Sequence, residues 1–445
     1  MAASRDRIGI VCRSALGPAV LAFGLWRYGD VMLVPPLRAA IAGGHSASML
    51  RDFGGPLTGN DFAHIYAGSW ALWRGLDPYD PAVLLPAGQA IAGRGVLPYV
   101  YLPFTGLVLG PLAALPYGDA FLAWFLANHL MLWLAVLASF AALGLRWTWR
   151  SAAFAVLSVS ISYPLFRTLS AGQLNVALAL GYALFWLALA RRAEWLAGFM
   201  AAFLTLFKLS PGVLGLYLLW TRRWRAAGWA AIWASLLLLV SIAWTGPGVH
   251  LAFLPVLRDM GYGRSTWAQF GQHFYCDEAN QSFNALFHHL FAANPVAGSP
   301  LLNLGAGFAN GLTWAVSLGL LALVLLLTRP GRAGRDPGAD PLGYSLFIFL
   351  SLFLPSLCWD HCLVQLLFPT LAMFQRLEQR RALPTAVLFI LSLLVVSFPF
   401  NFWDERWKSG AGLFIMSWKL WGAAGLFAVN ALLFVRQGSE SEAKA

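Results

Sequence analysis

Polar residues interrupt an otherwise apolar chain in the segment TGNDFAHIYAGSWALWRGLDPYD, residues 58–80. This segment gathers Asp61, Asp77, Asp80 and His64 between long hydrophobic blocks. A carboxylate can act as a general base, accepting the proton of a hydroxyl group while that hydroxyl attacks a carbon atom. Asp61 is our candidate for such a base.

Each of these carboxylates also has a structural interpretation. Asp61 precedes the amphipathic run FAHIYAGSWALW, where it is positioned to cap the N-terminus of a helix. Asp77 and Asp80 lie in the proline-rich sequence LDPYDP, where aspartate commonly accepts hydrogen bonds from its own backbone. The spacing alone leaves both interpretations open.

Two cations near predicted helix ends suit a phosphate group. Arg167 lies in LFRTLS and Lys208 in FKLSPG, where Pro211 breaks the helix. Arginine and lysine form strong charge-assisted hydrogen bonds with phosphate oxygens, although both also snorkel to lipid headgroups. His361, in CWDHC, can hold a phosphate, orient a carboxylate, or simply be solvated.

A metal site is conceivable where Cys358 and Cys362 flank His361. Zinc sites built from thiolates and imidazoles need a further ligand, and none is near in the sequence. We therefore expect no metal and no cofactor, because the arginine and lysine can carry the charge that a metal would supply.

The elements that position these residues are predicted to be membrane-spanning helices. The 445-residue chain is 59% hydrophobic and 11% charged, with a mean hydropathy of +0.66, whereas a soluble domain carries roughly 25% charged residues. Many windows reach the ~20 apolar residues that cross a bilayer. The composition predicts an all-α polytopic protein with one membrane domain over residues 1–436 and a disordered tail over 437–445.

The net charge of +11 does not indicate nucleic acid. The arginines fall in short loops between apolar segments, which is the cytoplasmic signature of membrane proteins. Placing these loops inside predicts about twelve crossings, with both termini cytoplasmic. The predicted spans are 8–26, 119–145, 150–169, 173–190, 194–209, 211–221, 226–246, 302–328, 342–357, 361–375, 383–400 and 411–435.

This topology places two long loops, 27–118 and 247–301, outside the cytoplasm, and the first carries the amphipathic helices. Residues 96–116 are apolar but contain four prolines, so we interpret them as a re-entrant or interfacial segment. The polar clusters converge on the outer face. Besides the residues above, candidates for contacting a substrate there are Tyr66, Tyr79, Gln173, Asn175, Asn280, Gln281 and Trp359, although the NQS sequence at 280–282 is equally suited to cap a helix.

Four blocks of the sequence together resemble the integral-membrane glycosyltransferases of family 87, which have the GT-C fold. The sequence departs from the family pattern in having Tyr101-Leu102-Pro103 in place of Tyr-Pro-Pro, and Cys362 in place of a second histidine. The blocks are NDFAHIYAGSWALWRGLDPYD (60–80), GQLN (172–175), LAGFMAAFLTLFKLSPGVLGLYLLWTRRWRA (196–226), and the pair NQSFNALF (280–287) and CWDHCLVQLLFP (358–369).

The resemblance implies an inverting transfer of a sugar, mannose or arabinofuranose and with mannose favoured, from a polyprenyl-phosphate donor to a lipid or glycan acceptor at the outer face of the plasma membrane. It assigns the general base to Asp61 and a Trp-x-His element to Trp359 and His361. Arg167, Lys208 and His361 would then hold the donor phosphate. His64, Tyr66, Asp77, Tyr79, Asp80, Gln173, Asn175, Asn280, Gln281 and Trp359 would contact the sugar or the acceptor. Membrane lipids would surround the protein.

Other classes of membrane protein remain as alternatives. A lipid or glycan transporter or flippase would show paired repeats and charged residues at mid-span. This chain instead places its polar clusters near one face, which favours an enzyme. An O-antigen-ligase-type enzyme would lack the early carboxylate loop, and a sensor or structural protein would have no need of it.

Overall fold

The computed structural model describes residues 17–34, 37, 60–92, 95–330, 340–380 and 382–442. Within these ranges the chain forms helices and connecting segments, with two isolated β-bridges and no strand. The predicted all-α class is therefore confirmed. The start of the first predicted span, the loop residues 38–59 and the last three residues of the predicted tail lie outside the described part.

The N-terminal part of the described chain contains short helices followed by a long one. Residues 17–27 are helical and lead into the π-helix η1 (Tyr28–Leu33). The elements that follow are α3 (Asn60–Leu72), α4 (Pro81–Ala92), α5 (Pro103–Leu109), η3 (Gly110–Ala114), α6 (Tyr117–Leu143), α7 (Trp149–Ser160), α8 (Tyr163–Ala171) and α9 (Asn175–Ala190).

The rest of the chain alternates long apolar helices with short 3-10 turns. These elements are α10 (Glu194–Phe207), η4 (Ser210–Gly212), α11 (Val213–Trp220), α12 (Trp224–Thr245), α13 (Pro247–Asp259), η5 (Ala268–Phe270), η6 (Phe274–Cys276), α14 (Phe283–Phe291), α15 (Ala306–Leu327), α16 (Pro341–Phe353), η9 (Asp360–Leu366), α17 (Leu367–Gln379), α18 (Leu383–Ser397), η10 (Glu405–Trp407), α19 (Gly412–Met416) and α20 (Trp418–Glu442).

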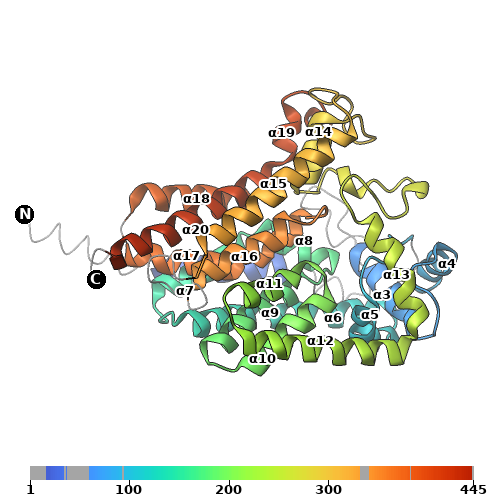
Figure 1. The fold of residues 1–445 in the computed structure, drawn as a ribbon, viewed down its shortest axis with the longest axis horizontal. Helices are drawn as coiled ribbons and strands as arrows, with labels where there is room; N and C mark the ends of the chain where they lie inside the picture. The colour runs from blue at the N-terminus through green and yellow to red at the C-terminus, as the bar shows by residue number, and fades with distance from the viewer. Residues whose placement is uncertain are drawn as a thin grey trace, which may run out of the picture.

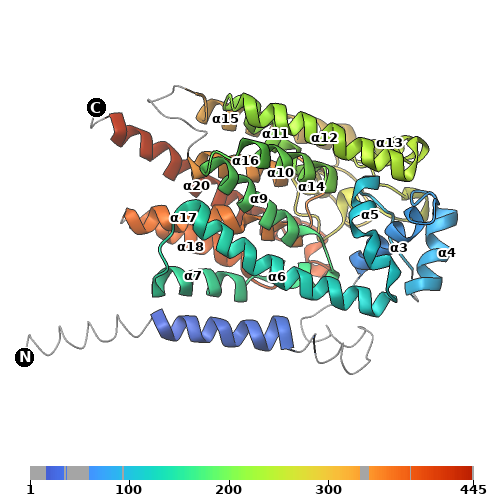
Figure 2. The same ribbon diagram turned by 90° about the horizontal axis from the view of Figure 1, so that it is seen from below.

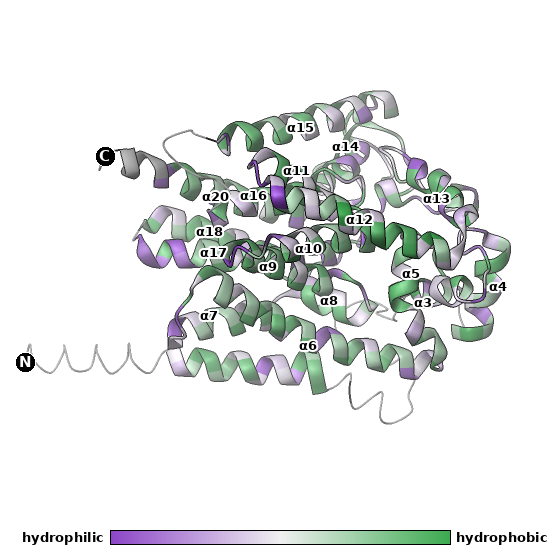
Figure 3. Ribbon diagram, turned by 60° about the horizontal axis from the view of Figure 1, so that its bottom comes forward, coloured by the Kyte–Doolittle hydropathy of each residue, from purple (hydrophilic) through white to green (hydrophobic). Residues whose placement is uncertain are grey.

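The count of about twelve crossings is not confirmed. Within the described residues, α6, α12, α15 and α20 are long and apolar enough to span a membrane, and α7 with α8 would make a fifth span, bent by 54°. The other predicted crossings that lie wholly in the described part correspond to shorter apolar helices, because polar residues and prolines interrupt the hydrophobic runs. Hydrophobic residues cover the outward side of α12, which the structure leaves exposed (Figure 3).

The helices run lengthwise, and the polar segments gather at their ends. The helix at residues 17–27 begins, and α20 ends, at the same end of the molecule, while α3, α4, α5 and α13 lie at the opposite end (Figures 1 and 2). The most extensive packing between helices joins α10 to α12 and α6 to α9. The two helices of each pair run in the same direction, since Phe199 of α10 packs on Trp233 of α12 and Trp124 of α6 bonds to Gly172 just before α9.

Two expectations for the outer loop and the tail are changed by the structure. α3 was expected to be amphipathic, yet almost all of its residues are buried, because α4, α5 and η3 cover it. α20 continues to Glu442, so helix extends into the predicted tail at 437–445. Residues 96–116 form the α5 and η3 helices, which together extend about 18 Å and are shorter than the ~30 Å bilayer core.

Candidate active site

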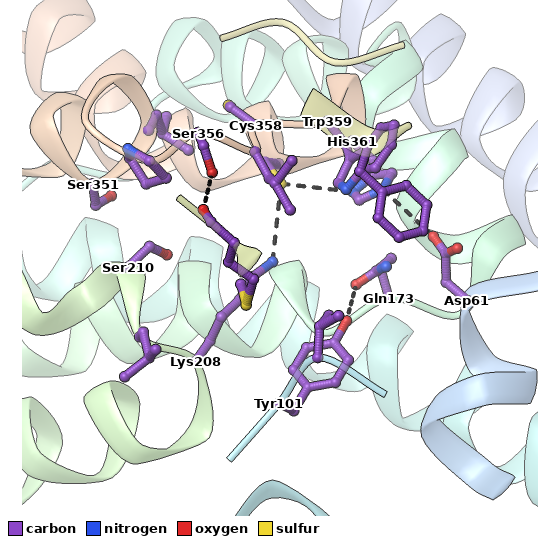
Figure 4. Close-up of a pocket in the computed structure, with 18 of the residues that line it drawn as sticks. Asp61, Tyr101, Gln173, Lys208, Ser210, Ser351, Ser356, Cys358, Trp359 and His361 are labelled. Carbon is purple, nitrogen blue, oxygen red and sulfur yellow. Dashed lines mark hydrogen bonds and ion pairs between the residues drawn. The ribbon is translucent and has the colours of Figure 1, made fainter. Parts of the chain in front are cut away.

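A cavity of about 630 Å³ lies where α3, α8, α9, α10 and η9 meet. Seven of the sequence-predicted site residues line it, although they come from segments up to 300 positions apart in the chain. They are Asp61, His64, Arg167, Gln173, Lys208, Trp359 and His361. Figure 4 shows Asp61 and His361 in contact at one side of this cavity, with Lys208 approaching from another side.

Local helix ends explain how the polar residues reach the cavity. α8 ends at Gly172, whose φ of +72° is the left-handed conformation typical of a helix C-terminus. A side chain at this position would also collide with Phe62 of α3, since an added Cβ would lie 2.5 Å from the Phe62 Cβ. Because the Gly172 backbone packs closely against α3, the segment that contains Gln173 lies next to the helix that carries Asp61.

The Asp61 carboxylate contacts the His361 imidazole. The distance from Asp61 Oδ2 to His361 Nε2 is 3.4 Å, and the two side chains are 17% and 4% exposed. Asp61 therefore keeps one side open to the cavity, while the histidine is enclosed. The Thr168 hydroxyl donates a hydrogen bond to the His361 carbonyl (2.9 Å), which anchors η9 to α8.

Lys208 is held at the end of α10 by the neighbouring helix. Its Nζ donates to Asn175 Oδ1 (3.1 Å) and lies 3.9 Å from the Cys362 sulfur. No carboxylate within the described ranges lies close enough to form an ion pair with it. The lysine therefore brings a positive charge into the cavity that none of the described carboxylates neutralises.

Arg167 differs from Lys208 because it already has a counterion. Its Nε lies 3.4 Å from Asp360 Oδ2, and the Asp360 side chain is completely buried. The guanidinium also packs over the Trp403 ring at 5.3 Å. Because Asp360 offsets its charge, Arg167 can offer a ligand only a reduced positive potential.

Asp277 is a cavity carboxylate that the sequence analysis did not single out. Its Oδ1 accepts a hydrogen bond from the Ala279 backbone N–H at 2.9 Å. Burial raises the pKa of the Asp277 carboxyl from its ordinary value to about 7, an effect that the Ala279 hydrogen bond partly opposes. The group therefore titrates near neutral pH.

We expect Asp277→Asn to increase the free energy of unfolding at about pH 8 and to have little effect near pH 4. Between those values the unfolded carboxyl is ionised while the folded one keeps its proton, so the stability of the wild type falls as pH rises toward 7 and then levels off. Thermal unfolding in detergent across this range measures the difference.

The matched control for this prediction is Asp404→Asn. Arg406 holds the pKa of the exposed Asp404 carboxyl at about 2, so the stability difference for this variant should be constant above about pH 4. A stabilisation by Asp277→Asn that does not grow between pH 4 and 7 would contradict the assignment.

Much of the remaining wall of the cavity is apolar. Most of these residues come from the segment before α5, the start of α11, the end of α13 and the end of α16 with its following turn. They are Leu97, Pro98, Val100, Leu102, Leu209, Val213, Leu257, Met260, Leu350, Leu352, Leu354, Pro355 and Leu357. One cavity thus combines a charged side with a hydrocarbon-like side.

Four predicted residues of the first loop do not line the cavity. Asp77 Oδ1 accepts from the Tyr79 N–H (2.9 Å), and Asp80 Oδ1 accepts from the Ala82 N–H (2.8 Å), so both carboxylates shape the turn into α4. The Tyr79 hydroxyl donates to the Tyr101 carbonyl, and the Tyr66 hydroxyl donates to the Leu115 carbonyl. These contacts support the structural interpretation of the turn.

The three remaining amides also lie outside the cavity lining. Asn280 donates to the Phe274 and Ser356 carbonyls and accepts from Ser282 and Cys358, which fixes the segment before Trp359. Gln281 accepts from the first N–H groups of α20, at Lys419 and Leu420. Asn175 is fully buried between Lys208 and His361.

The structure adds residues that the sequence analysis missed. Tyr101 stacks on His64 and donates to Gln173 Oε1 (3.2 Å), and Trp403 lines the cavity from the loop after α18. The Asp277-Glu278 pair, just before the NQS sequence, was a visible signal for a carboxylate in an outer loop. Trp403 had no comparable signal. The described chain contains no group of three His, Cys, Asp or Glu side chains arranged as metal ligands.

Comparisons with known proteins point to one family. The sequence profile of glycosyltransferase family 87 matches residues 99–356, more than half of the chain. A curated relative from Mycolicibacterium smegmatis, named polyprenol-phosphate-mannose-dependent alpha-(1-2)-phosphatidylinositol pentamannoside mannosyltransferase, is 29% identical over 269 residues, which are 60% of this chain and 58% of the relative. A relative of the same name from Mycobacterium tuberculosis is 31% identical over 167 residues, 37% of this chain and 38% of the relative.

The matched regions therefore span less than two thirds of either relative. The profile match also begins after Asp61 and ends before His361. Residues that line the cavity on both sides of the matched range are thus assigned by their geometry alone.

Proposed function

This chain belongs to glycosyltransferase family 87, and from this membership we propose that it transfers a mannosyl residue from a polyprenyl-phosphate-mannose donor to the hydroxyl of a lipid-linked glycan. The names of both relatives support the donor and the sugar. The observation that carries the proposal is the single cavity that joins Asp61 and Lys208 to an apolar wall.

The two sides of the cavity suit the two parts of such a donor. Isoprenoid units are pure hydrocarbon and gain free energy on burial against apolar side chains, at roughly 25 cal/mol per Å². The wall formed by Leu257, Val213 and Leu354 can hold the units nearest the phosphate. The phosphate would then lie beside Lys208, which forms no ion pair with a carboxylate in the part of the chain that the structure describes.

The proposed reaction is a single displacement at the sugar C1 atom. Asp61 accepts the proton of the acceptor hydroxyl, and the hydroxyl oxygen forms a bond to C1. The bond from C1 to the phosphate oxygen breaks, and polyprenyl phosphate departs with the electron pair. Lys208 stabilises the charge that develops on the departing phosphate, and attack from the opposite face inverts the configuration at C1.

Arg167 and Trp403 support a place for the acceptor glycan. Aromatic rings stack on sugar faces, as Trp403 and Trp359 can in this cavity, and the Arg167 guanidinium and the Asp277 carboxylate can bind sugar hydroxyls. We assign Asp277 and Trp403 to the acceptor side because they lie in the loops that follow η6 and α18, whereas Lys208 follows α10.

Charge distribution supports a site on the extracytoplasmic side. α9 begins beside the cavity at Asn175 and α10 ends there at Lys208, so the loop between them lies at the other end of the bundle. That loop contains Arg191 and Arg192, and Arg223 of the next loop lies 3.9 Å from Glu194. Clustered arginines favour the cytoplasmic side for that end, which leaves the cavity outside, at the plasma membrane.

The test is transfer by the purified protein. Radiolabelled polyprenyl-phosphate-mannose should give a labelled glycolipid when a membrane lipid extract is supplied as acceptor, and polyprenyl-phosphate-arabinofuranose should give much less. Movement of the donor across vesicle membranes without formation of a labelled product would instead identify a flippase.

A further inference from the structure

We infer that Asn175 is a positioning residue: its side-chain amide sets the tautomer of His361, so that the imidazole presents an N–H group to Asp61. This inference rests on the proposed function for its catalytic meaning. The arrangement itself depends only on three side chains that come from α9, α10 and η9.

The orientation of the Asn175 amide is fixed by its neighbours. Its Oδ1 accepts hydrogen bonds from Lys208 Nζ and from Gln365 Nε2, each at 3.1 Å. A lysine ammonium can donate but cannot accept, so the oxygen and not the nitrogen of the amide must face it. The Asn175 side chain is completely buried, and no solvent replaces these partners.

The amide nitrogen consequently faces the imidazole. Asn175 Nδ2 lies 2.9 Å from His361 Nδ1. An amide NH₂ group only donates, so Nδ1 must accept and must carry no proton. The Cys362 sulfur lies 3.8 Å from the same atom, a longer and weaker contact than the 2.9 Å amide bond, so the amide decides the role of Nδ1.

The proton of the neutral imidazole therefore resides on Nε2, the atom 3.4 Å from Asp61 Oδ2. In the tautomer with the proton on Nδ1, the lone pair of His361 Nε2 would face a lone pair of Asp61 Oδ2. The N–H group orients the Asp61 carboxylate and leaves its second oxygen to receive the acceptor proton. Contacts of this kind are often long before substrate binds and shorten in the reactive complex.

The same amide links the donor side to the acceptor side. Lys208, which would contact the phosphate, and His361, which contacts the base, bind opposite ends of one side chain. Displacement of Lys208 would leave the Asn175 oxygen held by Gln365 alone, which weakens the restraint on the amide. Asn175 thus makes the orientation of Asp61 depend on the position of Lys208.

The isosteric variant Asn175→Asp tests the inference. It retains an oxygen for Lys208 and Gln365, but its second oxygen accepts a hydrogen bond from Nδ1–H, whereas the asparagine NH₂ donates one to Nδ1. We expect both ring nitrogens of His361 to be protonated near neutral pH in ¹⁵N-histidine NMR spectra, whereas the wild type should show a bare Nδ1 and a protonated Nε2. The His361→Gln variant identifies the signals.

Activity provides a second readout. We expect kcat to fall at least about 10-fold in Asn175→Asp, because a wrongly protonated imidazole costs up to roughly 10⁴-fold in the serine proteases. The KM for the donor should rise as well, because the new carboxylate pairs with Lys208 and reduces the positive potential at the phosphate. Gln173→Glu is the matched control: it adds the same charge to the same cavity but does not touch His361, so the ring signals should stay as in the wild type.

Two outcomes would overturn the inference. One is a wild-type His361 that carries its proton on Nδ1, and the other is an unchanged protonation pattern in Asn175→Asp. The NMR measurement needs no substrate, so a protein with the expected tautomer but without mannosyl transfer would contradict the proposed function and leave the role of Asn175 intact.

Discussion

Asp61→Asn should lower the rate of sugar transfer by at least ~10²-fold, the scale on which a general base contributes. Asparagine occupies the same space and can still contact His361, but its side chain cannot accept the proton of the acceptor hydroxyl. The loss should therefore appear in kcat with a nearly unchanged KM for the donor. Initial rates with labelled polyprenyl-phosphate-mannose measure it.

Asp119→Asn provides the matched control for this prediction. Asp119 is an exposed carboxylate in the first turn of α6, near α3, and it does not line the cavity. Its substitution should leave transfer at the wild-type rate. Transfer by Asp61→Asn at more than a tenth of the wild-type rate would assign the base to another group, and Asp277 is the carboxylate in the cavity that would then be examined first.

The second large effect is expected for Lys208→Gln. The departing phosphate gains negative charge in the transition state, and Lys208 is the cation of the cavity that lacks a carboxylate partner within the described ranges. Loss of one preorganised group of this kind typically costs about 10²–10³-fold. We expect kcat/KM for the donor to fall on this scale, and inhibition by free polyprenyl phosphate to weaken in parallel.

A lysine outside the cavity distinguishes this effect from a general change in charge. Lys408 contacts Glu278 and Glu405 in the same outer region, and it does not line the cavity. Lys408→Gln removes the same charge and should leave kcat/KM within about twofold of the wild type, the precision of such assays. Equal losses in the two variants would contradict a specific role for Lys208.

The sequence predicted best those site residues whose position depends on the membrane topology and not on detailed side-chain packing. Arg167, Gln173, Lys208 and His361 each lie at or near a helix end, and the basic loops indicated that these ends share one side of the membrane. Successive membrane-spanning helices run in opposite directions, so every second loop lies on the same side of the membrane. The structure does bring these four residues into one cavity with Asp61.

The count of about twelve spans is not confirmed, for a related physical reason. The mean hydropathy of a sequence window does not show whether the helix is continuous. The chain breaks at Ile161–Ser162 and at Lys208–Pro211 end helices inside runs that are apolar on average, which leaves α8 and α11 as short helices. Breaks of this kind expose backbone groups and side chains where a ligand can reach them.

Other site residues were beyond the reach of sequence patterns. Trp403 enters the cavity from a loop nearly 240 positions after the arginine on which it packs, so its place depends on how α18 and α20 pack against α8. Asn175 was expected to contact the substrate because polar residues at helix ends often do. Its burial between Lys208 and His361 is a property of the assembled bundle.

The composition of the cavity wall has a consequence for how such proteins diversify. Asp61, His361 and Lys208 lie on helices whose packing is fixed by buried neighbours, whereas Asp277 and Trp403 belong to loops. Loops tolerate insertion and substitution far better than packed helices. If Asp277 and Trp403 contact the acceptor as proposed, remodelling of these two loops would change which acceptor is bound, while the packed helices that carry Asp61 and His361 stay the same.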